Sequence, residues 1–198
     1  MTDHNHYGGD PESLLSVSYP NAQLSNLVLT IENRRRLWNV VMEQRQWDKI
    51  TFHGLQPVRR LLFTGPPGTG KTSTAQALAG ELGVPLYTVR LDLLTTHPKD
   101  EGEAEFRQVL DTLRQTYGVF VFDGVAEFTE ENRWILVMLQ QFLMQDTSKS
   151  VIIVATWMEL EVIMLSEISQ AQKDKYHIFS LVCGFRLSIV MILLRKII

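Results

Sequence analysis

The residues with the clearest chemical potential form one glycine-rich run, GPPGTGKTS, at positions 65–73. Its first eight residues fit the pattern G-x-x-x-x-G-K-[ST], which predicts a loop that wraps the phosphates of a nucleotide. In such a loop, glycines let backbone amides approach the phosphates, Lys71 reaches the β- and γ-phosphates, and the Thr72 hydroxyl can ligate magnesium. A Gly-Pro turn without a ligand is the alternative. The predicted nucleotide-binding residues here are Gly65, Pro66, Pro67, Gly68, Thr69, Gly70, Lys71, Thr72 and Ser73.

The sequence around this loop alternates between short apolar runs and amphipathic segments. The apolar runs predict buried strands, and the amphipathic segments predict helices, as in residues 102–115, where Phe106, Val109, Leu110 and Leu113 share one face. Near-continuous apolar strands separated by helices indicate a parallel sheet with helices on both faces. The predicted fold is therefore a three-layer α/β fold of the P-loop NTPase type. The predicted strands are RRLLFT, PLYTVRLD, GVFVFD and VIIVAT.

Two segments are predicted to precede this core. Residues 1–21 are polar and lack a sustained period, which predicts a flexible N-terminal segment. A single long helix is then predicted from Thr30, its N-cap, to Gly54, which ends it. The apolar residues expected near one face of this helix are Trp38, Val41, Met42 and Ile50.

The form GPPGTGKT, preceded by HGLQPVRRLLFT, resembles the AAA family of ATPases. The resemblance weakens along a stretch from about residue 27 to about residue 156, in which ELGVPLYTVRLD and EGEAEFRQVLD are similar to the family's second strand and following helix. It implies an AAA-type nucleotide-binding core over residues 22–157 that binds ATP or ADP with Mg²⁺ and hydrolyses the β–γ phosphoanhydride. By the same resemblance Gly54 and Leu55 border the adenine, although Gly54 can equally serve only as a helix C-cap.

The second half of the site departs from the family pattern. Asp123, at the end of GVFVFD, matches the carboxylate that holds hydrated magnesium, with a helix N-cap as the alternative role. Thr72 and Asp123 are the predicted magnesium ligands, partly through water. The glutamate that polarises the attacking water is replaced by Gly124, a degenerate Walker B motif. General-base help is typically worth about 10²–10⁴-fold in rate, so we expect weak or absent hydrolysis.

Three residues are thus the catalytic candidates: Lys71, Asp123 and Glu127, the last as a weaker substitute base. If only the base is missing, Gly124→Glu is expected to raise turnover. The family's polar sensor is replaced by Trp157, whose indole accepts no hydrogen bond. Thr156 is the nearest polar substitute for that sensor.

A segment in the middle of the sequence and the C-terminal part also depart from the family. The segment LTTHPKDEGE lacks the aromatic residue with which family members grip a polypeptide, and no Arg-Phe pair follows Trp157. Residues 158–198 are predicted to form a divergent segment in which the helical lid of the family is absent or a remnant. The sequence leaves open whether this segment is a natural, truncated or frame-shifted end.

Charge, cysteine content and hydropathy indicate which partners and which cellular compartment to expect. The net charge is −3, and 21% of residues are charged, so no basic excess points to nucleic acid. The single cysteine, Cys183, cannot form an internal disulfide, and no signal peptide opens the chain, which favours the cytoplasm. Arg186 splits the last apolar run into pieces shorter than the roughly 18 residues of a membrane span, so membrane contact is not expected.

Three functions fit these observations. The first is an AAA ATPase that self-associates or acts on a protein client. The second is a non-catalytic, nucleotide-dependent switch or scaffold, because the base is lost while the phosphate and metal residues are kept. The third and weakest is a small-molecule kinase, because only Lys173 and Lys175 lie between Trp157 and Phe185 to shield a transferring phosphoryl group. The client, the pathway and the oligomer size are not encoded in any recognisable motif.

Overall fold

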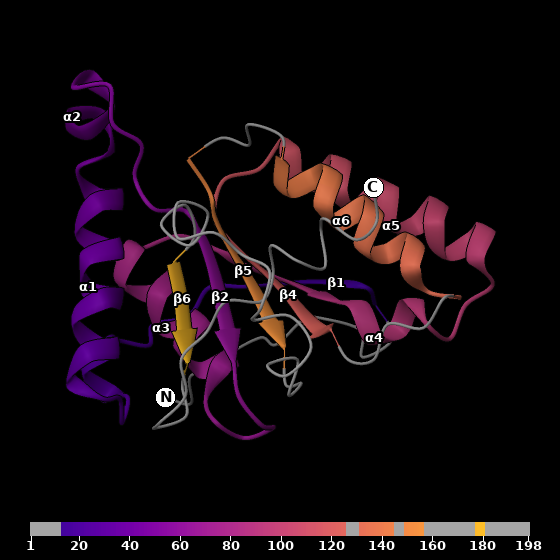
Figure 1. Cartoon of the computed structure of the whole chain (residues 1–198), viewed down its shortest axis with the longest axis horizontal. Helices are drawn as coiled ribbons and strands as arrows, with labels where there is room; N and C mark the ends of the chain where they lie inside the picture. The colour runs from indigo at the N-terminus through magenta and orange to yellow at the C-terminus, as the bar shows by residue number, and fades with distance from the viewer. Residues whose placement is uncertain (1–12, 126–130, 145–148, 157–176, 181–198) are drawn as a thin grey trace, which may run out of the picture.

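A computed structural model of the chain describes residues 13–125, 131–144, 149–156 and 177–180. Within these ranges one six-stranded sheet has the order β1-β3-β4-β5-β2-β6 (Figure 1). The strands are β1 (Leu15–Ser18), β2 (Arg60–Thr64), β3 (Leu86–Arg90), β4 (Val119–Val125), β5 (Val151–Thr156) and β6 (His177–Ser180). The helices are η1 (Leu24–Asn26), α1 (Ile31–Arg45), α2 (Trp47–Phe52), α3 (Lys71–Leu82), α4 (Leu91–Leu94), α5 (Lys99–Arg114) and α6 (Arg133–Met144).

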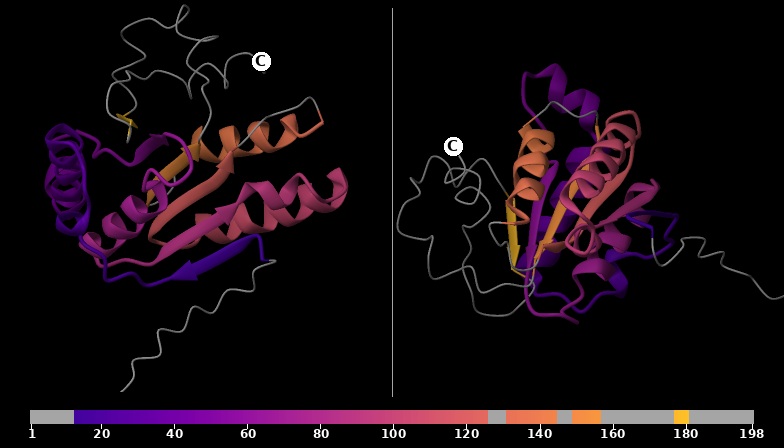
Figure 2. Two further views of the ribbon diagram at one scale, coloured as in Figure 1. Left: turned by 90° about the horizontal axis from the view of Figure 1, so that it is seen from below. Right: turned by 90° about the vertical axis from the view of Figure 1, so that its right-hand side faces the viewer.

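Helices cover both faces of the sheet, as the sequence predicts (Figure 2). The alternation of side chains along β4 shows how: Val119 and Val121 join the core formed with α1 and α3, whereas Phe120 and Phe122 join the core formed with α5 and α6. A strand buried on both sides needs apolar residues at every position, which explains its continuous apolar sequence. The predicted three-layer α/β fold is confirmed.

The N-terminal prediction is wrong for β1. Leu15–Ser18 are not a flexible lead-in but pair antiparallel with β3, so the sheet carries one antiparallel edge strand. The preceding residue, Leu14, is only 2% exposed and belongs to the core on the α5 side. Four residues are too few to show whether apolar and polar side chains alternate, so the sequence does not distinguish this strand from an irregular polar segment.

The predicted single helix before the phosphate loop is two helices. α1 ends at Arg45, Gln46 leaves the helical conformation with φ −104° and ψ 22°, and α2 begins at Trp47. The two predicted ends are confirmed: the Thr30 side chain accepts a hydrogen bond from the Asn33 amide, and Gly54 follows α2 with φ +73°.

The buried face of α1 also differs from the prediction. Val41 is fully buried as expected, but Trp38 is 43% exposed, and Leu37 and Val40 take its place in the core. Trp38 lies on the outer side, where the guanidinium of Arg45 stacks over its ring at 5.8 Å. Met42, also predicted on the buried face, is 38% exposed, so the buried face of α1 is rotated by about one residue from the predicted face.

The C-terminal end of α1 holds the segment that leads into β2. The Glu43 carboxylate accepts a hydrogen bond from the Val58 amide at 2.9 Å, and the Gln44 amide donates one to the Val58 carbonyl at 2.6 Å. These two bonds satisfy both backbone groups of Val58 from one helix end. Gln44 is itself buried, where polar groups need such partners. This contact fixes the start of the strand that carries the phosphate loop.

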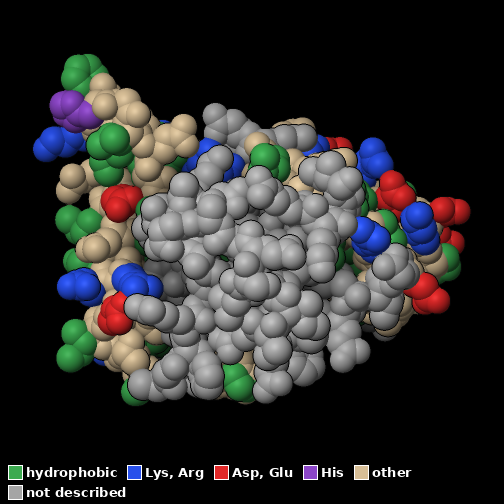
Figure 3. Space-filling model, viewed as in Figure 1, with side chains coloured by type: hydrophobic (Ala, Val, Ile, Leu, Met, Phe, Trp, Pro, Cys, Tyr) green, Lys and Arg blue, Asp and Glu red, His purple; other side chains and the backbone are tan. Residues whose placement is uncertain are grey.

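Among the residues described, no helix is long and apolar enough to cross a membrane. The last apolar run, for which membrane contact was considered, lies outside the described residues except for β6. In the view of Figure 3, charged side chains of both signs lie on the surface at the α1 end and at the α5 end.

Candidate functional site

The glycine-rich loop joins the end of β2 to the start of α3. Three of its glycines have a positive φ: Gly65 at 145°, Gly68 at 82° and Gly70 at 89°. Side-chain-bearing residues rarely adopt these conformations, so the loop needs glycine at these positions. Gly70 directly precedes the first turn of α3, whose free amides and helix dipole make an anion-binding end.

Lys71 is the first residue of α3 and points into the loop rather than into solvent. It is only 9% exposed, and its ammonium group donates hydrogen bonds to the carbonyls of Gly65 at 2.6 Å and Pro66 at 2.9 Å. Burial lowers the pKa of the Lys71 ammonium group, and the negative charge of Asp123 opposes this shift. The cation therefore already lies against the backbone of the loop that the sequence assigns to phosphates.

Two threonine hydroxyls brace the loop. Thr69 donates to the Pro66 carbonyl and Thr74 donates to the Gly70 carbonyl, both at 2.8 Å. The remaining predicted loop residues are accessible for a ligand. Of these, Pro66, Pro67, Gly68, Thr72 and Ser73 are exposed.

The structure brings the two predicted magnesium ligands together. The Thr72 hydroxyl lies 3.5 Å from one carboxylate oxygen of Asp123, and the other oxygen accepts a hydrogen bond from the Gly124 amide at 2.8 Å. Adjacent ligands of an ion with bonds of about 2.0–2.1 Å lie about 3 Å apart, so these two oxygens fit Mg²⁺ with a small adjustment or through water. No cluster of three or more His, Cys, Asp or Glu side chains that could hold a metal ion occurs in the described ranges.

Gly124 occupies a bulge at the end of β4. The β4–β5 register passes from Phe122 opposite Val154 to Val125 opposite Thr156, so β4 contains one extra residue there. Gly124 has φ +81°, and a Cβ atom built on it would lie 3.0 Å from both the amide nitrogen and a carboxylate oxygen of Asp92. The sequence shows glycine at this position, but it does not reveal that the backbone conformation and the contact with Asp92 would both strain any side chain placed there.

A charged pair that sequence reasoning missed lies beside Asp123. Arg90, the last residue of β3, is the register partner of Asp123 on β4 and donates to the Asp92 carboxylate at 2.9 Å. The hydrogen bond and charge of Asp92, and less strongly the charge of Asp123, raise the pKa of the Arg90 guanidinium. The available signal was positional: charged residues that end neighbouring parallel strands meet at one edge of a sheet.

The other residues predicted for the site lie at the ends of α2 and β5 or outside the described residues. Gly54 ends α2 as expected, and Leu55 beside it is 64% exposed, but their role at the adenine stays a prediction. Thr156 ends β5 opposite Thr64 of β2. Glu127 and Trp157 lie outside the described residues.

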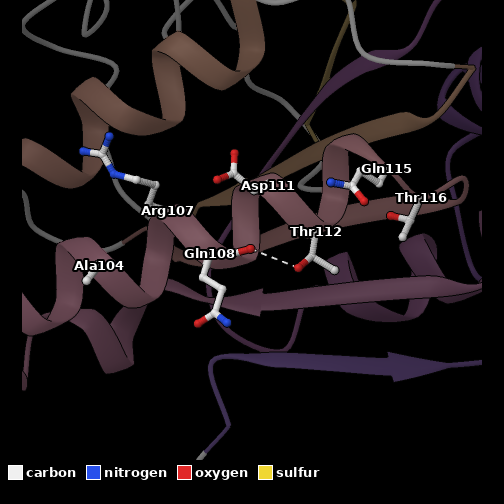
Figure 4. A pocket seen from close by; sticks show the side chains of 7 residues that line it. All are labelled: Ala104, Arg107, Gln108, Asp111, Thr112, Gln115 and Thr116. Atoms are coloured by element: carbon white, nitrogen blue, oxygen red, sulfur yellow. Dashed lines mark hydrogen bonds between the residues drawn. The ribbon is translucent and has the colours of Figure 1, made fainter.

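An open hollow of about 570 Å³ lies over the outer surface of α5 (Figure 4). Its lining comes from α5 and the turn after it and is polar except for one alanine, and the Thr112 hydroxyl donates to the Gln108 carbonyl of the same helix. Because α5 packs on the sheet face opposite α3, the hollow is separate from the glycine loop. Its lining residues are Ala104, Arg107, Gln108, Asp111, Thr112, Gln115 and Thr116.

Comparison with known proteins agrees with this geometry. The model of the "ATPase family associated with various cellular activities (AAA)" matches residues 61–175. The chain is 38% identical over 104 residues to the uncharacterized AAA family ATPase y4kL of Sinorhizobium fredii, covering 52% of this chain and 32% of that protein. It is 34% identical over 116 residues to the ribosome biogenesis ATPase RIX7 of Saccharomyces cerevisiae, covering 51% of this chain and 14% of that protein.

Two further likenesses extend this comparison. The chain is 30% identical over 114 residues to the ATP-dependent zinc metalloprotease FtsH 3 of Sphaerobacter thermophilus, covering 58% of this chain and 23% of that protein. The crystal structure of the FIGL-1 AAA domain superposes with a TM-score of 0.61 at 20% identity, covering 85% of this chain and 58% of that one, a likeness of fold. The chain thus spans a third or less of each of these three curated relatives.

Proposed function

The chain belongs to the AAA family of ATPases, and from that premise we propose that residues 22–157 bind ATP and ADP with Mg²⁺ through the loop at 65–73. The observation that carries this proposal is the buried Lys71 ammonium group, which lies inside a glycine loop at a helix N-terminus. A phosphate is the ligand whose charge and hydrogen-bonding needs match that cation and the free amides of α3.

Each site residue then has a definite role. Lys71 contacts the β- and γ-phosphates, the amides of the loop and of the first α3 turn surround the β-phosphate, and Gly54 and Leu55 border the adenine. Thr72 and Asp123 hold the magnesium ion, partly through water. When bound, magnesium would neutralise part of the negative charge of the phosphates.

Hydrolysis is proposed to be slow. A carboxylate that orients the attacking water is worth about 10²–10⁴-fold, and Gly124 stands where the family has that carboxylate. The same residue favours a second candidate, a nucleotide-dependent switch or scaffold whose partner recognises the bound state. In either case the partner is proposed to be a protein client or further copies of the chain, and the compartment the cytoplasm.

The test measures nucleotide binding and phosphate release on the same full-length protein. Binding is followed with a fluorescent ATP analogue, and release from Mg-ATP is followed across a protein concentration series, with Lys71→Ala as the blank. We expect binding that depends on Lys71, with phosphate release close to the blank.

The opposite result has a definite meaning. Release that vanishes in Lys71→Ala and rises with protein concentration would contradict slow hydrolysis and indicate an assembling ATPase with a substitute base. Glu127→Gln would then be measured next. Binding that is the same in Lys71→Ala would contradict the site itself.

A further inference from the structure

We propose that Asp92 is a positioning residue for the magnesium side of the site: its carboxylate holds the Arg90 guanidinium and thereby keeps Asp123 available to the magnesium–nucleotide complex. This inference rests on the proposed function, because it assigns a role to residues around the same nucleotide site.

The first step is that Arg90 and Asp123 lie on the same face of the sheet. Side chains alternate along a strand, and Leu86 of β3 and Val119 of β4 both face the core formed with α1 and α3. Arg90 lies four residues beyond Leu86, and Asp123 four residues beyond Val119, so both share that face. This is the face on which α3 presents Lys71 and Thr72.

The second step is that Arg90 is close enough to compete for Asp123. The two residues are register partners on neighbouring strands, which lie about 4.7–4.9 Å apart. A guanidinium can bind both oxygens of a carboxylate at once, and such a pair would occupy the oxygens that now face the Thr72 hydroxyl and the Gly124 amide. An Arg90–Asp123 pair would therefore oppose metal binding by charge and by occupancy.

The third step is that Asp92 offers Arg90 another acceptor. Arg90 donates to Asp92 at 2.9 Å, and the two side chains are 40% and 49% exposed. Gly124 has no side chain, which favours this position of Asp92: a Cβ on residue 124 would lie 3.0 Å from both the amide nitrogen and a carboxylate oxygen of Asp92, a tight contact. The glycine that removes the family's glutamate thus also makes room for the acid that holds Arg90.

The experiment measures the Mg²⁺ concentration at the midpoint of fluorescent ADP binding to the full-length protein. Asp92→Asn keeps the size of the side chain but removes the charge that holds Arg90, so we expect the midpoint to rise about 1.5- to 5-fold, the range for a partly exposed ion pair. Asp92→Glu should restore most of the difference. Adding Arg90→Gln to Asp92→Asn should return the midpoint to that of the unaltered protein.

The matched control is Asp111→Asn. Asp111 also pairs with an arginine, Arg114, and is 54% exposed, but it lies on α5 across the sheet. Its midpoint should not change. Circular dichroism checks that each variant is folded, and Asp92→Ser, which also removes the charge and should raise the midpoint, replaces Asp92→Asn if that variant is unstable.

The outcomes separate the two proposals. Equal midpoints for the unaltered protein and Asp92→Asn would overturn this inference, as would a raised midpoint that Arg90→Gln does not reverse. Binding that requires Lys71 but no Mg²⁺ in any variant would overturn this inference alone. Lack of Lys71-dependent binding in the unaltered protein would overturn the proposed function and this inference with it.

Discussion

Replacing Lys71 by alanine is expected to weaken Mg-ATP binding about 10- to 150-fold. The lysine is nearly buried, its cation lies inside the loop, and hydrogen bonds to charged groups contribute about 1.5–3 kcal/mol each. Calorimetric titration of purified protein measures the change directly. Because an alanine leaves the glycines and the two bracing threonines in place, the variant should remain folded.

Lys99→Ala is the control for the loss of a lysine. Lys99 is exposed at the start of α5, a helix on the other face of the sheet. Its removal should leave ATP affinity unchanged. If the two variants bind ATP equally well, the glycine loop is not the nucleotide site.

Placing a side chain at Gly124 is expected to destabilise the protein by at least about 2 kcal/mol. The left-handed conformation alone costs a side-chain-bearing residue roughly 1–2 kcal/mol, and the new Cβ would also meet the Asp92 amide nitrogen at 3.0 Å. Urea unfolding of Gly124→Ala measures the free-energy change. Because the clash involves backbone, it cannot be relieved by a side-chain rotation alone.

Gly83→Ala separates the two causes of this loss. Gly83 ends α3 with φ +66°, and a Cβ there has no atom within 4 Å. This variant should therefore lose only the conformational part, roughly 1–2 kcal/mol. Equal losses at Gly83 and Gly124 would show that contact with Asp92 adds nothing.

The structure also changes the expected outcome of Gly124→Glu. From the sequence, that substitution should raise turnover if only the base is missing. With φ +81° and Asp92 in contact, the new glutamate is instead expected to disturb the end of β4 beside Asp123 and give no gain in phosphate release. A clear gain at unchanged stability would contradict this interpretation of the bulge.

The parts of the site that the sequence predicts are those encoded locally. The loop from Gly65 to Thr72 is a contiguous motif whose glycines are needed by its own backbone, and its position between a strand and a helix follows from periodicity. The meeting of Thr72 with Asp123 follows one step further, because carboxyl ends of parallel strands share an edge.

The features that the sequence does not predict depend on contacts between distant segments. The Gly124 bulge is recognisable only with Asp92 beside it, and the Arg90–Asp92 pair matters only because β3 and β4 are in register. The break at Gln46 is equally invisible, since no proline or glycine marks it. In β1, pairing to β3 rather than any local pattern forms the strand.

The edge strand β1 has a consequence for how the protein should be prepared. β1 covers the outer side of β3, and the Leu14 carbonyl accepts a hydrogen bond from the Arg90 amide at 3.0 Å. A shortened protein that starts at residue 22, the core boundary predicted from the sequence, would expose the unpaired amides and carbonyls of β3. Such an open edge recruits strands from other molecules, so aggregation of the shortened protein could be mistaken for functional assembly.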